Sequence, residues 1–176
     1  LALILQDKET VFETDLLAPL VEEVRKLTLQ KSKPSSLRII ADHLRGAVFL
    51  TADGVRPLNV GRGYVLRRIL RRAILHGRLL GIRGYFLLGP ARLVIKMYGE
   101  VYPELAERDK EIQPVIEDEE QKFSQTLNKG LKVMEKMDKK IDAFVLYDTF
   151  GFPLELTQEL AQSNGLEVDV KEFEKK

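Results

Sequence analysis

Residues 37–81 read LRIIADHLRGAVFLTADGVRPLNVGRGYVLRRILRRAILHGRLLG, and this stretch predicts a helix, a loop and a second helix in succession. From Leu37 to about Thr51, apolar side chains recur three or four positions apart, which is the spacing of one buried helix face. The segment 54–63 holds three Gly and one Pro in ten residues. That composition is typical of a loop whose backbone approaches another group closely. A second apolar stripe predicts a helix from about Tyr64 to Leu80.

Arginine is concentrated in the same part of the chain. Residues 38–92 contain 11 Arg, no Lys and two Asp, so their net charge is 11 − 2 = +9, in a chain whose total is +1. In the second helix the arginines fall at i,i+4 spacing, where like charges repel by a few tenths of a kcal/mol per pair. A bound anion would relieve this repulsion, and the guanidinium fork suits phosphates and base edges. The pattern favours a nucleic-acid-binding surface; a solvated basic face is the alternative.

The composition, 44% apolar and 31% charged over 176 residues, is that of an ordinary soluble protein. The absence of Cys excludes disulfides and thiolate metal sites. No apolar run approaches the roughly 18 residues of a membrane-spanning helix, and no targeting leader is visible. The two His are too far apart to suggest zinc, so we predict no metal site. Because the sequence does not start with Met, we expect a piece of a longer protein.

The charge is divided unevenly along the chain. Residues 1–92 carry 16 basic and 8 acidic groups, a net of +8, whereas residues 93–176 carry 12 and 19, a net of −7. We therefore expect a basic helical subdomain over 1–92, which contains the Arg-rich helix. Residues 93–176 should form an acidic helical subdomain with a long helix and the LYDTFGFP turn.

Apolar periodicity predicts helices in most of the remaining sequence. The expected segments are Ala18–Leu29, Pro90–Tyr98, a short helix after Pro103, Arg108–Met137, Asp142–Phe150 and Leu154–Ser163. Ser35 or Ser36 is expected to cap the helix that follows, and Pro114 to bend the long one. The acidic run 117–120 is interpreted as a solvated face. The predicted fold is all-α, with six or seven helices in two packed helical subdomains, one long bent helix and almost no strand.

No convincing catalytic residue emerges. Gly61-x-Gly63 lacks the third Gly and the preceding strand of a nucleotide-binding loop. His43 follows Asp42 in an amphipathic helix and is expected to be a half-buried structural residue. Two polar residues stand in suggestive places: Asn59 in the glycine-rich loop and Asp148 at a helix-to-turn junction. Either could hydrogen-bond a base, but from the residues alone an Asx-turn for Asn59 and a cap or turn role for Asp148 are favoured, because Asn and Asp are common turn residues.

Two long segments, ADHLRGAVFLTADGVRPLNVGRGYVLRRILRRAILHGRLLG (41–81) and LYDTFGFPLELT (146–157), closely resemble the alanyl-tRNA synthetase family. The resemblance extends over essentially the whole chain and implies the helical tRNA-recognition (middle) region that follows the class II catalytic domain. The implied partners are the acceptor stem of tRNA(Ala) and the upstream catalytic domain of the same polypeptide, with no membrane partner. ATP and Mg²⁺ would serve the full-length enzyme, and this fragment would hold no cofactor. The implied location is cytoplasmic, with an organellar form as the alternative.

The resemblance also implies roles for particular residues. Asn59 and Asp148 match the family's Asn and Asp that recognise a G·U wobble pair in the acceptor stem. Such a pair leaves the guanine 2-amino group unpaired in the shallow minor groove of A-form RNA, where side chains reach it. The arginines implied to bind tRNA phosphates are Arg62, Arg67, Arg68, Arg71 and Arg72. The alternatives are a helix-turn-helix-like DNA-binding domain and a protein-interaction scaffold built on the long helix.

Overall fold

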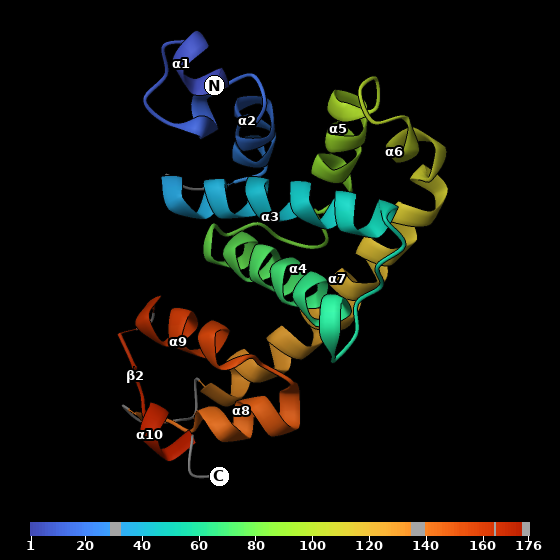
Figure 1. The fold of residues 1–176 in the computed structure, drawn as a ribbon. Helices are drawn as coiled ribbons and strands as arrows, with labels where there is room; N and C mark the ends of the chain where they lie inside the picture. Colours follow the sequence, from blue (N-terminus) through green and yellow to red (C-terminus); the bar gives the residue numbers. More distant parts are fainter. Residues whose placement is uncertain (29–32, 135–139, 164, 174–176) are drawn as a thin grey trace. The chain divides into compact units, whose positions relative to one another are not determined.

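The computed structural model describes residues 1–28, 33–134, 140–163 and 165–173, and the predicted all-α fold is confirmed. The helices (Figure 1) are α1 (Ala2–Leu5), the 3₁₀ helix η1 (Val11–Glu13), α2 (Ala18–Lys26), α3 (Pro34–Ala52), α4 (Gly61–Leu79), α5 (Leu88–Tyr98), α6 (Pro103–Glu107), α7 (Asp109–Met134), α8 (Ala143–Phe150), α9 (Leu154–Ser163) and α10 (Val170–Phe173). Within these residues the helices outnumber the six or seven predicted, and the short helices α1, η1 and α10 lie where no helix was predicted. None of the described helices is both long enough and apolar enough to span a membrane.

The chain divides into two compact units, Leu1–Glu120 and Gln121–Lys176. Helix α7 contributes its first part to one unit and its second part to the other. The charge-based division at residue 92 falls inside α5, which packs on α3 within the first unit. The boundary between the basic and the acidic part of the sequence therefore differs from the boundary between the two packed units.

The centre of the first unit is the pair α3 and α4, which lie side by side (Figure 1). Each presents an apolar stripe to the other, and α2 and α5 cover α3. The fully buried side chains of this core include Leu20, Leu37, Ile40, Leu44, Leu66, Leu70, Leu75 and Leu87. Most of these side chains lie in the helix–loop–helix stretch 37–81, which therefore supplies most of this core. Burial of each leucine stabilises the fold by about 1.5–3 kcal/mol.

Helix α3 begins one turn earlier than the Ser35/Ser36 cap predicted. Pro34 is its first residue, and Lys33 caps it without a side-chain hydrogen bond. Proline is favoured at that position because its missing N–H would be unpaired there anyway. Ser36 is buried instead, and its Oγ lies 3.0 Å from His76 Nδ1 in α4. The cap prediction was wrong because this serine serves the α3–α4 contact.

The second unit is built around two phenylalanines. Phe123 on α7 and Phe152, directly after α8, are fully buried with ring centroids 5.6 Å apart. Gly130 gives Phe152 its space, since a Cβ there would lie 2.7 Å from the ring. Two short strands, β1 (Lys140–Ile141) and β2 (Glu167–Val168), pair in parallel in this unit.

The close approach of α4 to Phe86 yields a packing prediction. A Cβ at Gly77 would lie 2.3 Å from the Phe86 ring, so Gly77→Ala should destabilise the fold by about 1–3 kcal/mol through overpacking. In α3, Gly46→Ala is the matched control, because its nearest neighbour would be Ile69 Cδ1 at 3.9 Å. That change should stabilise by roughly 0.5–1 kcal/mol. Denaturant unfolding of both variants measures the difference, and equal effects would contradict the packing argument.

Candidate nucleic-acid interface

The loop between α3 and α4 is held against the start of α4 by backbone contacts. Gly63, in the first turn of α4, contacts the loop: Leu58 N donates to Gly63 O at 3.0 Å. A Cβ on Gly63 would lie 2.5 Å from Arg56 O and 2.6 Å from Leu58 Cβ. Only glycine permits this approach, so the second glycine of Gly61-x-Gly63 serves packing inside the protein.

Arginine side chains fix the loop at several points. Arg56 donates through Nη1 to Thr51 O at 3.3 Å and pairs with Glu111 at 3.4 Å. Arg108 donates to Ala52 O, at the end of α3. These contacts satisfy carbonyls that a helix end leaves without partners, and they give the loop one defined conformation.

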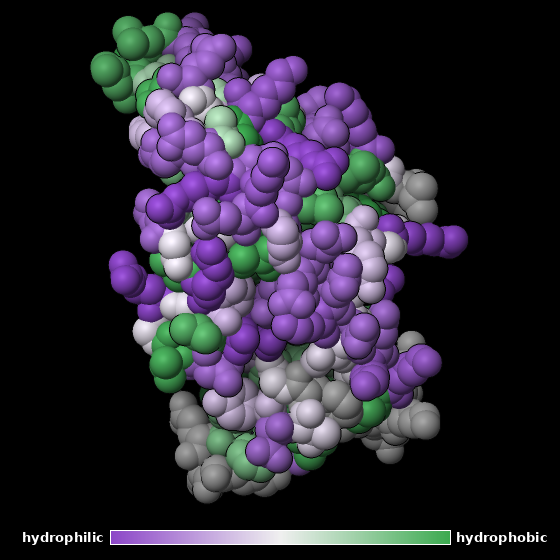
Figure 2. Space-filling model, turned by 90° about the vertical axis from the view of Figure 1, so that its right-hand side faces the viewer, coloured by the Kyte–Doolittle hydropathy of each residue, from purple (hydrophilic) through white to green (hydrophobic). Residues whose placement is uncertain are grey.

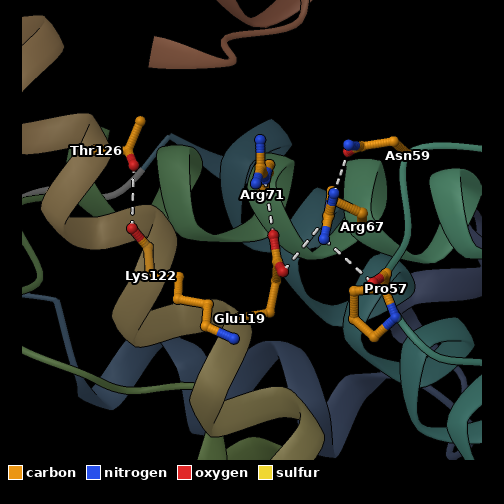
Figure 3. Close-up of polar contacts among 7 residues, drawn as sticks. All are labelled: Pro57, Asn59, Arg67, Arg71, Glu119, Lys122 and Thr126. Carbon is orange, nitrogen blue, oxygen red and sulfur yellow. Dashed lines mark hydrogen bonds and ion pairs between the residues drawn. The ribbon is translucent and has the colours of Figure 1, made fainter.

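The side chain of Arg67 connects this loop to α7 (Figure 3). Its Nη2 donates to Pro57 O at 3.1 Å, and its Nη1 donates to Asn59 Oδ1. Its Nε lies 3.6 Å from Glu119 Oε2. Because a guanidinium group has only donors, the Asn59 amide atom that faces it is the oxygen. The NH₂ group of this exposed asparagine is therefore the end available to a ligand.

Glu119 is shared by two arginines. Its Oε1 accepts from Arg71 Nε at 2.7 Å, while its Oε2 faces Arg67, and its side chain is only 4% exposed (Figure 3). Arg67 and Arg71 are four residues apart in α4 and so lie on one face of that helix. A buried carboxylate needs such partners, because an unpaired one costs several kcal/mol.

The interpretation of residues 117–120 as a solvated face was wrong for its last two members. Glu119 and Glu120 are 3% and 1% exposed. Glu120 accepts from the backbone N–H groups of Phe86, at 2.8 Å, and Leu87, at 3.2 Å, and so fixes the segment before α5. Burial raises the pKa of Glu120 to about 7, although these two hydrogen bonds act in the opposite direction. The helix buries the half of the acidic run that faces α4 and α5.

The predicted phosphate-binding arginines differ in exposure. Arg62 and Arg68 are exposed, whereas Arg67, Arg71 and Arg72 are partly buried. The start of α4 also exposes Tyr64 and Val65, and the loop exposes Leu58 and Val60. Figure 2 shows one face of the molecule, on which hydrophilic side chains dominate and apolar ones form separate patches. The α4 start is thus a surface of mixed basic and apolar character.

Asp148 lies in the other unit, exposed in the last turn of α8. Gly151, with φ +63°, ends this helix in the left-handed region that glycine favours. Asp142 caps the N-terminus by accepting from Phe144 N and Val145 N. The helix-to-turn junction predicted at Asp148 is confirmed, and the caps are supplied by other residues.

His43 is a half-buried residue, as expected. Its imidazole is 16% exposed and lies 3.4 Å from the Asp42 carboxylate. Burial lowers the pKa of His43, and the positive charge of Arg72 acts in the same direction. These contacts describe a structural histidine.

Sequence reasoning missed Glu119 as a member of the site, yet a signal was present. In α7 the apolar positions Ile112, Ile116 and Phe123 recur at helical spacing, and Glu119 occupies the inward position between the last two. A charged residue at a core position needs a buried partner, and the Arg-rich helix was the only large supply of positive charge in the sequence.

Comparisons with known proteins identify the family of this chain. The family of class II tRNA synthetases (A) matches residues 1–176. The alanine–tRNA ligase of Natranaerobius thermophilus is 45% identical over 190 residues, which cover 99% of this chain and 22% of the relative. The alanine–tRNA ligase of Thermotoga maritima is 45% identical over 175 residues, covering 93% of this chain and 20% of the relative. The chain therefore belongs to the class II tRNA synthetase (A) family, and it spans about a fifth of these relatives' length.

The buried carboxylate of Glu120 predicts a pH dependence of stability. Since its folded pKa, about 7, exceeds the ordinary 4.5, the folded state holds an extra proton between these values. Its contribution to stability is therefore complete below pH 4.5 and is lost as the pH rises through 7. The loss is on the order of 3 kcal/mol. In Glu120→Gln, which stays neutral and still accepts from Phe86 and Leu87, the loss should disappear.

Denaturant unfolding of the wild type and Glu120→Gln at pH 5 and pH 8 measures this loss. The exposed Glu104→Gln in α6 is the control and should keep the wild-type pH dependence. If Glu120→Gln and wild type lose the same stability between the two pH values, Glu120 is not the responsible group.

Proposed function

We propose that this chain is the part of an alanine–tRNA ligase that binds the acceptor stem of tRNA(Ala) and positions it for aminoacylation by a catalytic domain of the same polypeptide. The carrying observation is the α4 start, where a fixed, exposed asparagine amide stands beside exposed arginines. The similarity to a fifth of several alanine–tRNA ligases supports the choice of tRNA. In this proposal the chain belongs to the helical middle region of the ligase.

Base recognition is assigned to Asn59 and Asp148. A carboxylate accepts hydrogen bonds, so Asp148 would accept from the guanine 2-amino group that a G·U pair leaves unpaired in the minor groove. Asn59 would donate from its outward NH₂ group, because Arg67 occupies its oxygen. In a G·C pair the 2-amino group is already engaged with cytosine, so the same carboxylate gains less.

The arginines of α4 would hold the stem by its phosphates. Arg62 and Arg68 are the exposed members of the predicted set, and the partly buried Arg72, Arg67 and Arg71 add positive potential behind them. Val60 caps α4 without a side-chain hydrogen bond, and N–H groups at a helix start attract phosphate oxygens. Such contacts position RNA without reading its sequence.

In this proposal ATP and Mg²⁺ serve the remainder of the full-length ligase. Within the described residues no three His, Cys, Asp or Glu side chains gather as a metal site, and Gly63 is occupied by the loop above it. The helix-turn-helix alternative is disfavoured because the α3–α4 connection runs from Asp53 to Val60, whereas that motif uses a turn of about 3–4 residues.

Substitution of Asp148 tests base recognition. Asp148→Ala should reduce the preference for a G·U over a G·C acceptor-stem hairpin by roughly tenfold, the factor given by about 1.4 kcal/mol. Affinity for the G·C hairpin should change little, because the phosphate contacts remain. Titration of labelled hairpins measures both. The exposed neighbour Thr149→Ala is the control, and an equal loss on both hairpins would remove Asp148 from base recognition.

Salt dependence tests the phosphate contacts. The slope of log K against log salt is negative. Arg62→Gln and Arg68→Gln should each reduce its magnitude by about one, because each removes one phosphate contact. The exposed Lys96→Gln in α5 should leave the slope unchanged. Titrations with a duplex DNA of the hairpin's sequence belong to the same series. Unchanged slopes would exclude these arginines, and tighter binding to DNA than to the hairpin would favour the helix-turn-helix hypothesis.

A further inference from the structure

The guanidinium group of Arg67 faces three groups of the protein. One guanidinium nitrogen serves a backbone carbonyl of the loop, at Pro57, and another serves the Asn59 amide (Figure 3). Its Nε faces Glu119. All three directions of the fork point to groups of the protein, so this side chain is engaged within its own unit.

We propose that Arg67, held by Glu119, is a positioning residue that sets the conformation of the 57–59 loop segment and the orientation of the Asn59 amide toward RNA. This inference rests on the proposed function, because it concerns the same base-recognition surface. It assigns Arg67 to specificity, while general attraction for phosphate comes from its exposed neighbours.

The geometry explains why an arginine is needed at this position. A planar fork donates to two acceptors in fixed directions, whereas a lysine ammonium is a single point of charge on a flexible stem. The Pro57 carbonyl and the Asn59 amide oxygen are two such acceptors, two residues apart on the loop. Holding both fixes the loop and leaves the asparagine NH₂ group turned outward.

Glu119 supplies the other half of the arrangement. It is buried, and its two oxygens are divided between Arg67 and Arg71. The ion pair at 3.6 Å attracts the Arg67 guanidinium group toward α7, while its two other nitrogens donate to the loop. The position of an exposed recognition residue is thus tied to the core contact between α4 and α7.

The charge-preserving variant Arg67→Lys separates this role from phosphate binding. It should reduce the preference for the G·U hairpin about five- to tenfold, with unchanged affinity for the G·C hairpin and an unchanged salt slope. Arg83→Lys, an exposed arginine just after α4, is the matched control and should leave all three quantities unchanged. A retained G·U preference in Arg67→Lys, or a parallel loss of affinity for both hairpins, would overturn the inference.

A measurement without RNA keeps the inference separate from the proposed function. In the free chain, the Asn59 side-chain amide should be ordered by NMR relaxation in the wild type and mobile in Arg67→Lys. Glu119→Gln should also mobilise it, because the neutral amide can still accept from Arg71 through its one oxygen but loses the negative charge that attracts Arg67; an unfolding curve confirms that this variant folds. If the wild type shows no G·U preference, the proposed function fails. The amide data then decide alone whether Arg67 holds Asn59, and an amide equally ordered in all variants would refute that.

Discussion

The arrangement of the first unit depends on one buried carboxylate. Glu119 enters a largely apolar environment on α7, and it is stable there only because Arg67 and Arg71 reach it from one face of α4. Removing one partner of such a buried pair typically costs about 3–5 kcal/mol. The contact therefore fixes the rotation of α4 about its axis, and with it which arginines face the interior and which face solvent.

This constraint also explains which parts of the structure were predictable from sequence. The apolar stripes of α3 and α4 gave the helix–loop–helix and the core leucines, because a 3.6-residue period is a local property. Helix α9 begins and ends where its apolar pattern and the following Asn164-Gly165 indicated. The burial and the contacts of Ser36, Glu119 and Glu120 were not predicted, because each contact involves a partner 33 to 48 residues away along the chain.

The candidate site was predictable to a similar degree. Asn59 was placed correctly in a loop, and Asp148 at the end of a helix, from neighbouring glycines and apolar residues. The alternative roles from turn statistics were an Asx-turn for Asn59 and a cap or turn role for Asp148. In the structure Asn59 Oδ1 accepts from Arg67, and the caps of α8 are Asp142 and Gly151. The roles of both residues toward RNA stay predictions, because they rest on family resemblance and exposure.

The net charge of a sequence window overstates the field at the protein surface. Residues 38–92 carry +9, yet their arginines pair with acids from outside that window: Arg38 with Glu13, Arg56 with Glu111, and Arg67 and Arg71 with Glu119. Two of these acids, Glu111 and Glu119, lie in the half of the sequence whose net charge is negative. The acidic half of the sequence therefore partly neutralises the basic helix from within the fold. A positive field reduced in this way attracts nucleic acids of any sequence less strongly than the +9 of the window suggests, so the proposed selection of one RNA stem has to come from contacts to its bases.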